Sequence, residues 1–340
     1  MLSTTELTEI QSLLSTPKKI TIVCHRNPDG DAMGSSLGLL LFLKQLQHQV
    51  TFIAPNEYPD FLAWLPNATQ TVIFEREYDK ALPLLQNSDY IFTLDFNALH
   101  RTGDAMQKVL ETLSNPMIMI DHHQLPDSYA KYTFSDVNYG STCQMVYDFI
   151  NALGYNHLIN KDVATCLYTG IVTDSGSFRF PKTTPQTHQC VADLIDKGIN
   201  NSEIHNLLFD NSSYERLQLL GKALQNLRIV PQYKASYITL SQEELNAFNY
   251  KKGDTEGIVN YGLSIQGVIV TAIFIENKEE GIIKISFRSQ GDFDVNEFAR
   301  KYFNGGGHIN AAGGKSFSSL EETVNQFITI LAEEKERKEK

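Results

Sequence analysis

The N-terminal half of the chain alternates short, nearly continuous apolar runs with segments of helical periodicity, and this alternation is what most constrains the fold. The apolar runs cover residues 19–25, 50–54, 90–95 and 117–121. Helical patterns cover residues 31–47, 104–113, 141–153 and 162–173. Unbroken apolar runs are typical of strands that are buried on both faces, and strands that alternate with helices favour a parallel sheet. The sequence therefore predicts an α/β fold with a mostly parallel N-terminal sheet and helices on both faces.

The pattern changes after about residue 185. Helices are predicted at 186–209, 213–227, 257–264, 295–302 and 320–333, and strands at 235–240, 268–276 and 282–288. This order predicts a second, smaller α/β domain. We expect a first domain over 1–195, a helical connector over 196–228 and a second domain over 229–340, with a cleft between the two domains.

Composition limits the classes of partner. The 29 Lys and Arg residues are outnumbered by 40 Asp and Glu, which gives a net charge of −11. This sign disfavours a stable complex with long nucleic acid, but it allows a small anionic substrate that is held locally. The four cysteines match no zinc module and predict buried free thiols in a reducing compartment. No apolar run reaches the ~18 residues that span a bilayer, so we expect a cytoplasmic protein without a membrane partner.

Carboxylates and imidazoles follow the predicted strands of the first domain. The segment after the first strand, HRNPDGD at 25–31, has a Pro and a Gly that predict a tight turn, and it places Asp31 at the expected helix N-cap. Taken singly, each Asp is explained as a turn or cap residue and the paired histidines as a buried pair. The carboxyl ends of parallel strands, however, meet at one edge of a sheet. The candidates that we expect to meet there are His25, Asp29, Asp31, Asp95, Asp121, His122, His123 and Asp174.

So many negative groups in one place would repel each other in a low dielectric unless cations neutralised them. Oxygen ligands mixed with imidazole, and without thiolate, suit Mn²⁺, Mg²⁺, Fe²⁺ or Co²⁺ better than structural zinc. The set is too large for one ion and is sufficient for two, with Asp95 as the bridging ligand. Two ions about 3.5–4 Å apart are a recurrent device for in-line phosphoryl displacement.

The motifs and their order resemble those of the DHH-family phosphoesterases. They are HxNPDxD at 25–31, LDxN at 94–97, DHH at 121–123 and TDSG at 173–176. In the second half, SFRS at 286–289 and GGGHINAAGG at 305–314 resemble the DHH-associated C-terminal domain. A chain with only these two modules is similar to the nanoRNase/pAp-phosphatase branch. RecJ-type exonucleases carry additional domains, and a family II inorganic pyrophosphatase has a different C-terminal domain.

The resemblance implies a role for each motif residue of the first domain. One metal ion would be held by His25, Asp29 and Asp95, and the other by Asp31, Asp95, His122 and Asp174. Asp121 would orient the loop or the adjacent imidazole. His123 would face the scissile phosphate, either as an electrostatic stabiliser or as the acid that protonates the leaving oxygen. Arg101 matches an arginine that is common after the second motif and is predicted to join the catalytic group.

The glycine-rich segment of the second domain is predicted to bind the substrate. Three glycines let a backbone approach an anion closely and expose successive N–H groups, and an arginine can grip a phosphate bidentately. The predicted contacts are Arg288, Ser289, Gly305, Gly306, Gly307, His308 and Asn310.

Together these residues predict a hydrolase that uses two divalent ions, with Mn²⁺ expected first and Mg²⁺ or Co²⁺ as substitutes. We expect it to cleave short oligoribonucleotides to mononucleotides, with pAp as a further candidate substrate. The alternatives are the same chemistry on cyclic dinucleotides, on their linear products or on polyphosphate, and, from another class, a nucleotide-binding regulator without turnover. A homodimer is left open.

Overall fold

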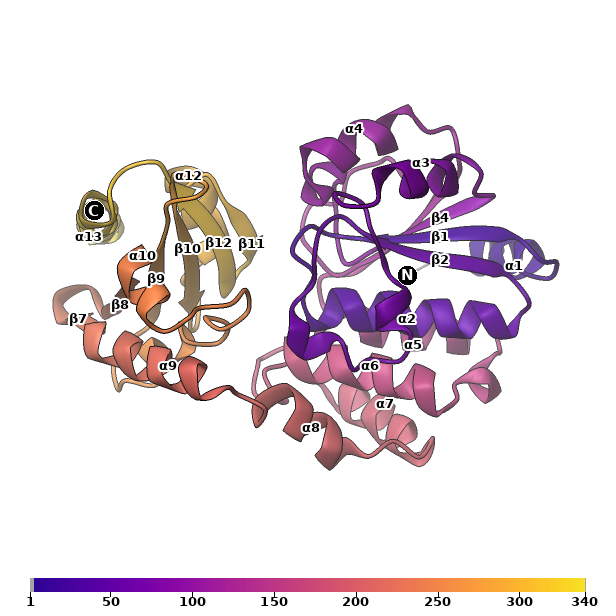
Figure 1. Ribbon diagram of the computed structural model, residues 1–340. Helices are drawn as coiled ribbons and strands as arrows, with labels where there is room; N and C mark the ends of the chain where they lie inside the picture. The colour runs from indigo at the N-terminus through magenta and orange to yellow at the C-terminus, as the bar shows by residue number, and fades with distance from the viewer. Residues whose placement is uncertain (1–2, 340) are drawn as a thin grey trace. The chain divides into compact units, whose positions relative to one another are not determined.

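The computed structural model describes residues 3–339, with side chains as far as Lys335. The chain forms two compact units, Met1–Asn211 and Ser212–Lys340, which are the indigo-to-pink and the orange-to-yellow parts of Figure 1. The division falls inside the range predicted as a helical connector. Helix α8 (Asn201–Phe209) belongs to the first unit and helix α9 (Tyr214–Asn226) to the second.

The first unit is built on a six-stranded sheet in the order β3-β2-β1-β4-β5-β6, in which every neighbouring pair is parallel. This confirms the predicted parallel sheet. Strands β3 and β6 are not evident from the sequence because they have only two and four residues, too few for a recognisable apolar run. The strands are β1 (Lys19–Cys24), β2 (Gln49–Ala54), β3 (Val72–Ile73), β4 (Tyr90–Leu94), β5 (Met117–Asp121) and β6 (Tyr132–Ser135).

Helices cover both faces of this sheet, as predicted (Figure 1). Helices α3 (Tyr78–Gln86) and α4 (Asp104–Thr112) share a core with one face. Helices α2 (Gly30–Gln45) and α5 (Thr142–Ala152) cover the other face, and α6 (Lys161–Asp174) and α7 (Pro185–Asp196) pack outside these two helices. Helix α1 (Thr4–Leu13), which the sequence analysis does not predict, adds Ile10 to the core on the α2 side. Short 3₁₀ turns lie at Asp60–Leu62, Ala68–Gln70, Leu99–Thr102, Asn156–Leu158 and, in the second unit, Pro231–Tyr233.

Helices α2 and α6 approach each other closely through glycines of α2. A Cβ atom on Gly34 would lie 2.5 Å from the carbonyl oxygen of Cys166, and one on Gly30 would lie 2.4 Å from the hydroxyl of Thr173. Only glycine permits this backbone separation. The close packing brings the first turn of α2, which carries Asp31, beside the last turn of α6, which carries Asp174.

Two details of the helices predicted for the first unit are wrong. The range 186–209 is two helices, α7 and α8, because the chain adopts a left-handed conformation at Gly198 (φ 88°) and restarts with Asn200 as the N-cap of α8. The N-cap of α2 is Asp29 rather than Asp31. The Asp29 carboxylate accepts hydrogen bonds from the backbone N–H groups of Asp31 and Ala32, and this leaves Asp31 inside the first turn.

The second unit is smaller and contains a mixed six-stranded sheet in the order β11-β12-β10-β9-β8-β7. Only β8 and β9 pair in parallel. The second α/β domain is thus confirmed, although the helix predicted at 257–264 is a single turn. The strands are β7 (Arg228–Val230), β8 (Ala235–Leu240), β9 (Val270–Asn277), β10 (Ile282–Ser289), β11 (Gly306–His308) and β12 (Ala311–Ser316). The remaining helices are α10 (Gln242–Ala247), α11 (Asn260–Leu263), α12 (Val295–Tyr302) and α13 (Leu320–Glu339).

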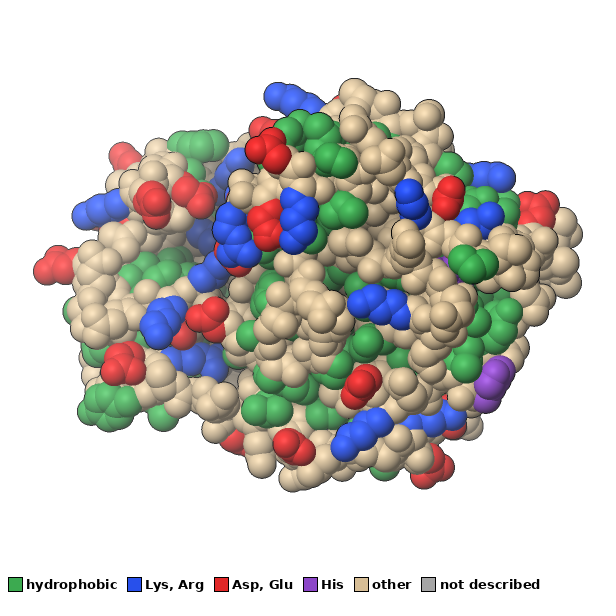
Figure 2. Space-filling view, turned by 45° about the vertical axis from the view of Figure 1, so that its right-hand side comes forward, with side chains coloured by type: hydrophobic (Ala, Val, Ile, Leu, Met, Phe, Trp, Pro, Cys, Tyr) green, Lys and Arg blue, Asp and Glu red, His purple; other side chains and the backbone are tan. Residues whose placement is uncertain are grey.

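The surface of the molecule carries charges of both signs. On the face shown in Figure 2, lysines and arginines are interspersed with acidic side chains. Within the described part of the chain, no helix combines the length and the apolar character that a membrane span requires.

Candidate metal centre

The register of the parallel sheet aligns three of the predicted residues at the carboxyl edge of the sheet. Cys24 of β1 pairs with Leu94 of β4, and Leu94 pairs with Ile120 of β5. The residues that come next along these strands are His25, Asp95 and Asp121. Strands β1 and β4 are neighbours, yet the chain leaves β1 for α2 on one face and β4 for α4 on the other. Such a switch point opens a crevice at the carboxyl edge of a sheet, where α/β proteins bind ligands.

Asp95 lies at the centre of this edge and faces two imidazoles. Its Oδ2 atom is 3.4 Å from Nε2 of His25, and its Oδ1 atom is 3.5 Å from Nε2 of His122. The residue is only 2% exposed and has a left-handed backbone (φ 64°), a conformation that Asp tolerates better than most residues. The two oxygens of one carboxylate are therefore divided between two different histidines.

The first of these histidines belongs to a group of three possible ligands. His25, Asp29 and Asp95 each place one ligand atom within 4.8 Å of the other two. Nδ1 of His25 donates to the carbonyl oxygen of Arg26 at 2.9 Å, so Nε2 is the ring nitrogen that faces the carboxylates and would be the one to bind a cation. Asp29 caps α2 with Oδ1 and presents Oδ2 to His25 at 3.8 Å.

The second histidine belongs to a similar group, which consists of Asp31, His122 and Asp174. Nε2 of His122 is 3.4 Å from Asp174 and 3.8 Å from Asp31. Its Nδ1 atom donates to the carbonyl oxygen of Tyr139 at 3.2 Å, so Nε2 is the ring nitrogen that faces the carboxylates and would be the one to bind a cation.

The electrostatics of both groups of side chains favour the binding of cations. Burial, with repulsion from neighbouring carboxylates, raises the pKa of Asp31 well above its ordinary value and the pKa of Asp174 to about 7. Burial alone would lower the pKa of His25 and of His122, but the surrounding carboxylates raise these values to about 8 and about 10. Imidazole nitrogen and carboxylate oxygen without thiolate form the donor set of Mn²⁺ and related divalent ions. The clustered side chains can therefore hold metal ions.

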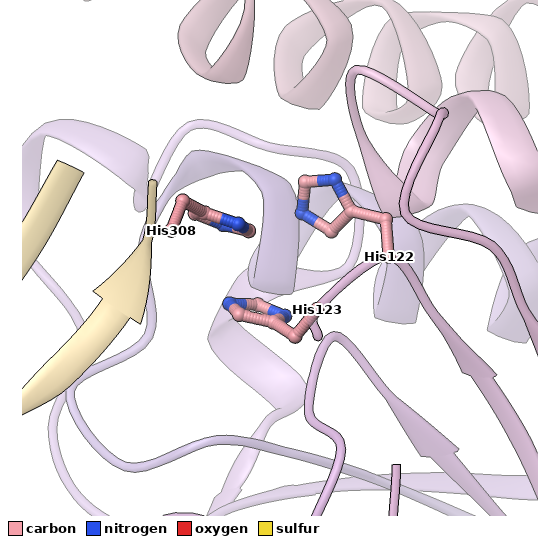
Figure 3. A group of neighbouring side chains, drawn as sticks. All are labelled: His122, His123 and His308. Atoms are coloured by element: carbon pink, nitrogen blue, oxygen red, sulfur yellow. The ribbon is translucent and has the colours of Figure 1, made fainter. Parts of the chain in front are cut away.

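His123 is held differently from His122, although the two rings lie side by side at the end of β5 (Figure 3). Nδ1 of His123 lies 2.7 Å from Oδ1 of Asp121, and Nη2 of Arg101 lies 3.4 Å from Nε2 of His123. A guanidinium group only donates, so Nε2 accepts and Nδ1 carries the proton toward Asp121. Burial holds the pKa of His123 well below its ordinary value. The structure thus groups Asp121, His123 and Arg101.

Two asparagines hold the motif loops in place. The backbone N–H of Asn27 donates to Asn56, and the Asn56 amide donates back to the Asn27 side chain, at 2.7 and 2.9 Å. Asn97 donates to the carbonyl oxygen of Gln124, just after the DHH segment. The sequence analysis does not single out Asn56. Its position directly after β2, at the same sheet edge, is the signal that could have identified it.

The glycine-rich segment of the second unit differs from its prediction. Gly306–His308 is not a loop but the edge strand β11, paired with β12. The backbone N–H of Gly305 donates to the carbonyl oxygen of Ala299, and that of Gly307 donates to the side chain of Asn296. The expectation of a run of available N–H groups is therefore wrong for these two residues, because acceptors of helix α12 use both N–H groups.

The remaining predicted substrate contacts lie near β11 within the second unit. Arg288 and Ser289 end strand β10, and Asn310 lies in the turn between β11 and β12. The Asn310 amide donates to the Ser289 hydroxyl at 3.0 Å, and that hydroxyl donates to the carbonyl oxygen of Phe293 at 2.6 Å. Arg288 donates to the carbonyl oxygen of Phe287 and pairs in register with Ala311. The second unit thus gathers these residues at one end of its sheet.

Known proteins share both the sequence pattern and the fold. The chain matches the profile "DHH family, N-terminal domain" over residues 19–171 and the "DHHA1 domain" over residues 232–336. It is 31% identical over 317 residues to the bifunctional oligoribonuclease and PAP phosphatase NrnA of Thermus thermophilus, an alignment that covers 93% of this chain and 90% of the relative.

Solved structures extend the comparison. The crystal structure of an exopolyphosphatase-related protein from Bacteroides fragilis is 37% identical, with a TM-score of 0.94 over 100% of this chain and 99% of that one. The structure of RecJ in complex with Mn²⁺ from Thermus thermophilus has a TM-score of 0.53 at 16% identity and covers 96% of this chain and 55% of that one. The latter similarity shows a shared fold.

Proposed function

The chain belongs to the DHH family, and we propose that it is a metal-dependent phosphoesterase that hydrolyses short oligoribonucleotides to mononucleotides. The observation that carries this proposal is the division of the Asp95 carboxylate, with one oxygen toward His25 and the other toward His122. A carboxylate that serves two ligand groups at once is what a pair of neighbouring cations requires. The name of the 31% identical relative supports the substrate class and adds pAp as a second substrate.

We assign one ion to the group around His25 and the other to the group around His122, with Asp95 shared by both. Divalent ions bound there would supply Lewis-acid activation of water and stabilise negative charge on the phosphoryl group. The mixed carboxylate and imidazole donors favour Mn²⁺, with Mg²⁺ and Co²⁺ as substitutes.

The residues around His123 would act on the substrate directly. Asp121 fixes the ring through Nδ1, and Arg101 brings a positive charge beside Nε2. An anionic phosphate beside Nε2 would raise the pKa of His123 and favour a proton there. The leaving oxygen could then take that proton, so His123 serves as the acid only when substrate is bound.

In the second unit, we propose that Arg288 and His308 bind the phosphate of the substrate, with Ser289, Gly306 and Asn310 shaping that end of the sheet. A guanidinium group matches phosphate bidentately. The net charge of −11 disfavours long polyanions and therefore favours short substrates. The four cysteines are buried free thiols, which supports our proposal that the protein works in the cytoplasm.

One experiment tests the proposed function. The metal-stripped protein is supplied with Mn²⁺ and one of five substrates: a 5′-phosphorylated diadenylate, a long RNA, pAp, a linear polyphosphate or a cyclic dinucleotide. We expect mononucleotide from the diadenylate, AMP from pAp and slow attack on the long RNA. Binding of the diadenylate without cleavage would point to a regulator instead. Preferred cleavage of polyphosphate or of the cyclic dinucleotide would reassign the substrate.

A further inference from the structure

The start of helix α5 contacts two of the carboxylates assigned to the metal centre. The hydroxyl of Thr142 donates to Oδ1 of Asp95 at 2.9 Å. The backbone N–H of Thr142 donates to Oδ2 of Asp31 at 2.6 Å, and that of Cys143 donates to Oδ1 of Asp31 at 2.9 Å. All four residues are buried, and Thr142 is completely inaccessible to solvent. One residue therefore touches a carboxylate from each ligand group.

The direction of these hydrogen bonds follows from the chemical groups that take part in them. The hydroxyl of Thr142 donates to a carboxylate oxygen of Asp95, which accepts. The backbone N–H groups of Thr142 and Cys143 can only donate, and both oxygens of Asp31 accept from them.

The side chain and the backbone of Thr142 thus have separate targets. The backbone bonds to Asp31 persist with any residue except proline at position 142, whereas the bond to Asp95 needs the hydroxyl. The hydroxyl of Thr142 lies 2.9 Å from Oδ1 of Asp95. The other groups that face its Oδ1 are His122 at 3.5 Å and His123 at 3.8 Å, both longer than the contact with Thr142.

We infer that Thr142 is a positioning residue of the metal centre, whose hydroxyl sets the orientation in which Asp95 offers its two oxygens to cations. Partners of this kind, which touch a ligand rather than the ion, commonly change metal affinity by about 10–100-fold when they are removed. The inference rests on the proposed function, since it presumes cations at Asp95. It assigns the start of α5, which lies outside the four motifs, to the same site.

The test compares Mn²⁺ binding by isothermal titration to metal-stripped wild-type protein and to Thr142→Val, Thr142→Ala and Thr142→Ser, at one pH. Val keeps the shape of Thr without the hydroxyl, and Ser keeps the hydroxyl. We expect Val and Ala to weaken the affinity for at least one Mn²⁺ by about tenfold or more, and Ser to restore it to within about threefold of wild type. If the Val variant does not fold by circular dichroism, the Ala variant decides the question.

Thr169→Val is the matched control. Thr169 is also completely buried, and its hydroxyl donates to the carbonyl oxygen of Thr165 in helix α6. We expect this variant to bind Mn²⁺ like the wild type. If wild-type protein binds no Mn²⁺, the proposed function fails. If it binds Mn²⁺ while the Val and Ala variants bind equally tightly, or if Thr169→Val loses as much affinity, the positioning role of Thr142 is overturned and the proposed function stands.

Discussion

His123 is held by Asp121 at two points: the Nδ1 atom of its ring lies 2.7 Å from Oδ1 of Asp121, and its backbone N–H donates to Oδ2 at 3.0 Å. One carboxylate thereby fixes both the ring and the main chain of the residue two positions later. His122, between them, turns its Nε2 toward Asp31, Asp95 and Asp174 instead. The two adjacent histidines therefore have different partners: His122 faces the candidate metal ligands, and His123 is hydrogen-bonded to Asp121.

This difference predicts separable effects of two substitutions. His123→Ala should lower kcat by about 10²–10⁴-fold, because it removes the proposed proton donor but leaves both ligand groups intact. His122→Ala should remove Mn²⁺ binding at one of the two positions. Steady-state kinetics and Mn²⁺ titration of both variants check this, and loss of an ion from His123→Ala would make His123 a ligand instead.

The carboxylate of Asp95 faces both ligand groups, so its substitution should have a stronger effect than that of either histidine. Asp95→Asn keeps the size of the side chain but removes the charge that faces His25 and His122, so turnover should disappear and the Mn²⁺ stoichiometry should fall. Asp193→Asn is the control, because Asp193 contacts Tyr147, Asn156 and Lys197 at the surface of the same unit. Full activity of Asp95→Asn would contradict the two-ion arrangement.

The raised histidine pKa values predict how metal-free protein responds to pH. The folded chain binds the His25 proton more tightly than the unfolded chain does, with a pKa of about 8 against an ordinary value of 6.5. The stabilisation is complete below pH 6.5 and is lost as the pH rises through about 8. The Asp121 and Asp174 carboxyls, both raised to about 7, act in the same direction. The free energy of unfolding of metal-free protein should therefore fall as the pH rises from 6.5 to about 8.

The affinity of the protein for Mn²⁺ should show the opposite trend over the same pH interval. Metal ions bind deprotonated imidazole, so the affinity should increase with pH and binding at pH 7 should release protons. Titration calorimetry in buffers with different ionisation enthalpies measures this release directly. Equal binding heats in all buffers would mean that the ligand histidines are already neutral in the metal-free protein.

The sequence could predict that most of the candidate metal ligands lie together, because His25, Asp95 and the DHH segment each follow or end a strand. In a parallel sheet the strand ends share one edge, so the motif residues after β1, β4 and β5 had to meet. Asp174 comes from a helix end instead, and its position depends on the close packing of α2 against α6 at Gly30 and Gly34. That packing is a tertiary contact, which a periodicity argument does not contain.

The parts that the sequence did not reveal depend on such contacts. Ser141 and Thr142 have the pattern of a helix start, and nothing local indicates that the second hydroxyl points to Asp95. The residues at 305–308 have the pattern of a flexible turn, because three glycines contain no strand signal. Their pairing with β12 comes from the sheet as a whole. Strands as short as β3 and β6 are not predicted from the sequence for the same reason.

The glycines of the second unit provide a matched pair for a stability test. A Cβ atom on Gly305 would lie 1.9 Å from the carbonyl oxygen of Gly313, whereas the nearest atom to one on Gly306 would be Asn296 Oδ1 at 3.4 Å. Gly305→Ala should therefore destabilise the second unit by about 1–3 kcal/mol, and Gly306→Ala should change it much less. Differential scanning calorimetry of the full chain compares the melting temperatures of the two variants. Equal shifts in melting temperature would show that the close backbone contact is not the reason for a glycine at position 305.

Arg288 allows the proposed substrate contact to be separated from metal binding. Arg288→Ala should raise KM for the dinucleotide by at least about tenfold, since a hydrogen-bonded charge is worth about 1.5–3 kcal/mol, and it should leave Mn²⁺ affinity unchanged. Arg288→Lys should recover only part of the loss, because an ammonium group lacks the planar fork that matches phosphate. Lys284→Ala is the control: it removes a positive charge from the same face of β10, four residues away, and should leave KM unchanged. If Arg288→Ala loses Mn²⁺, the residue supports the metal centre; if Lys284→Ala raises KM equally, the effect is one of general charge rather than of a specific phosphate contact.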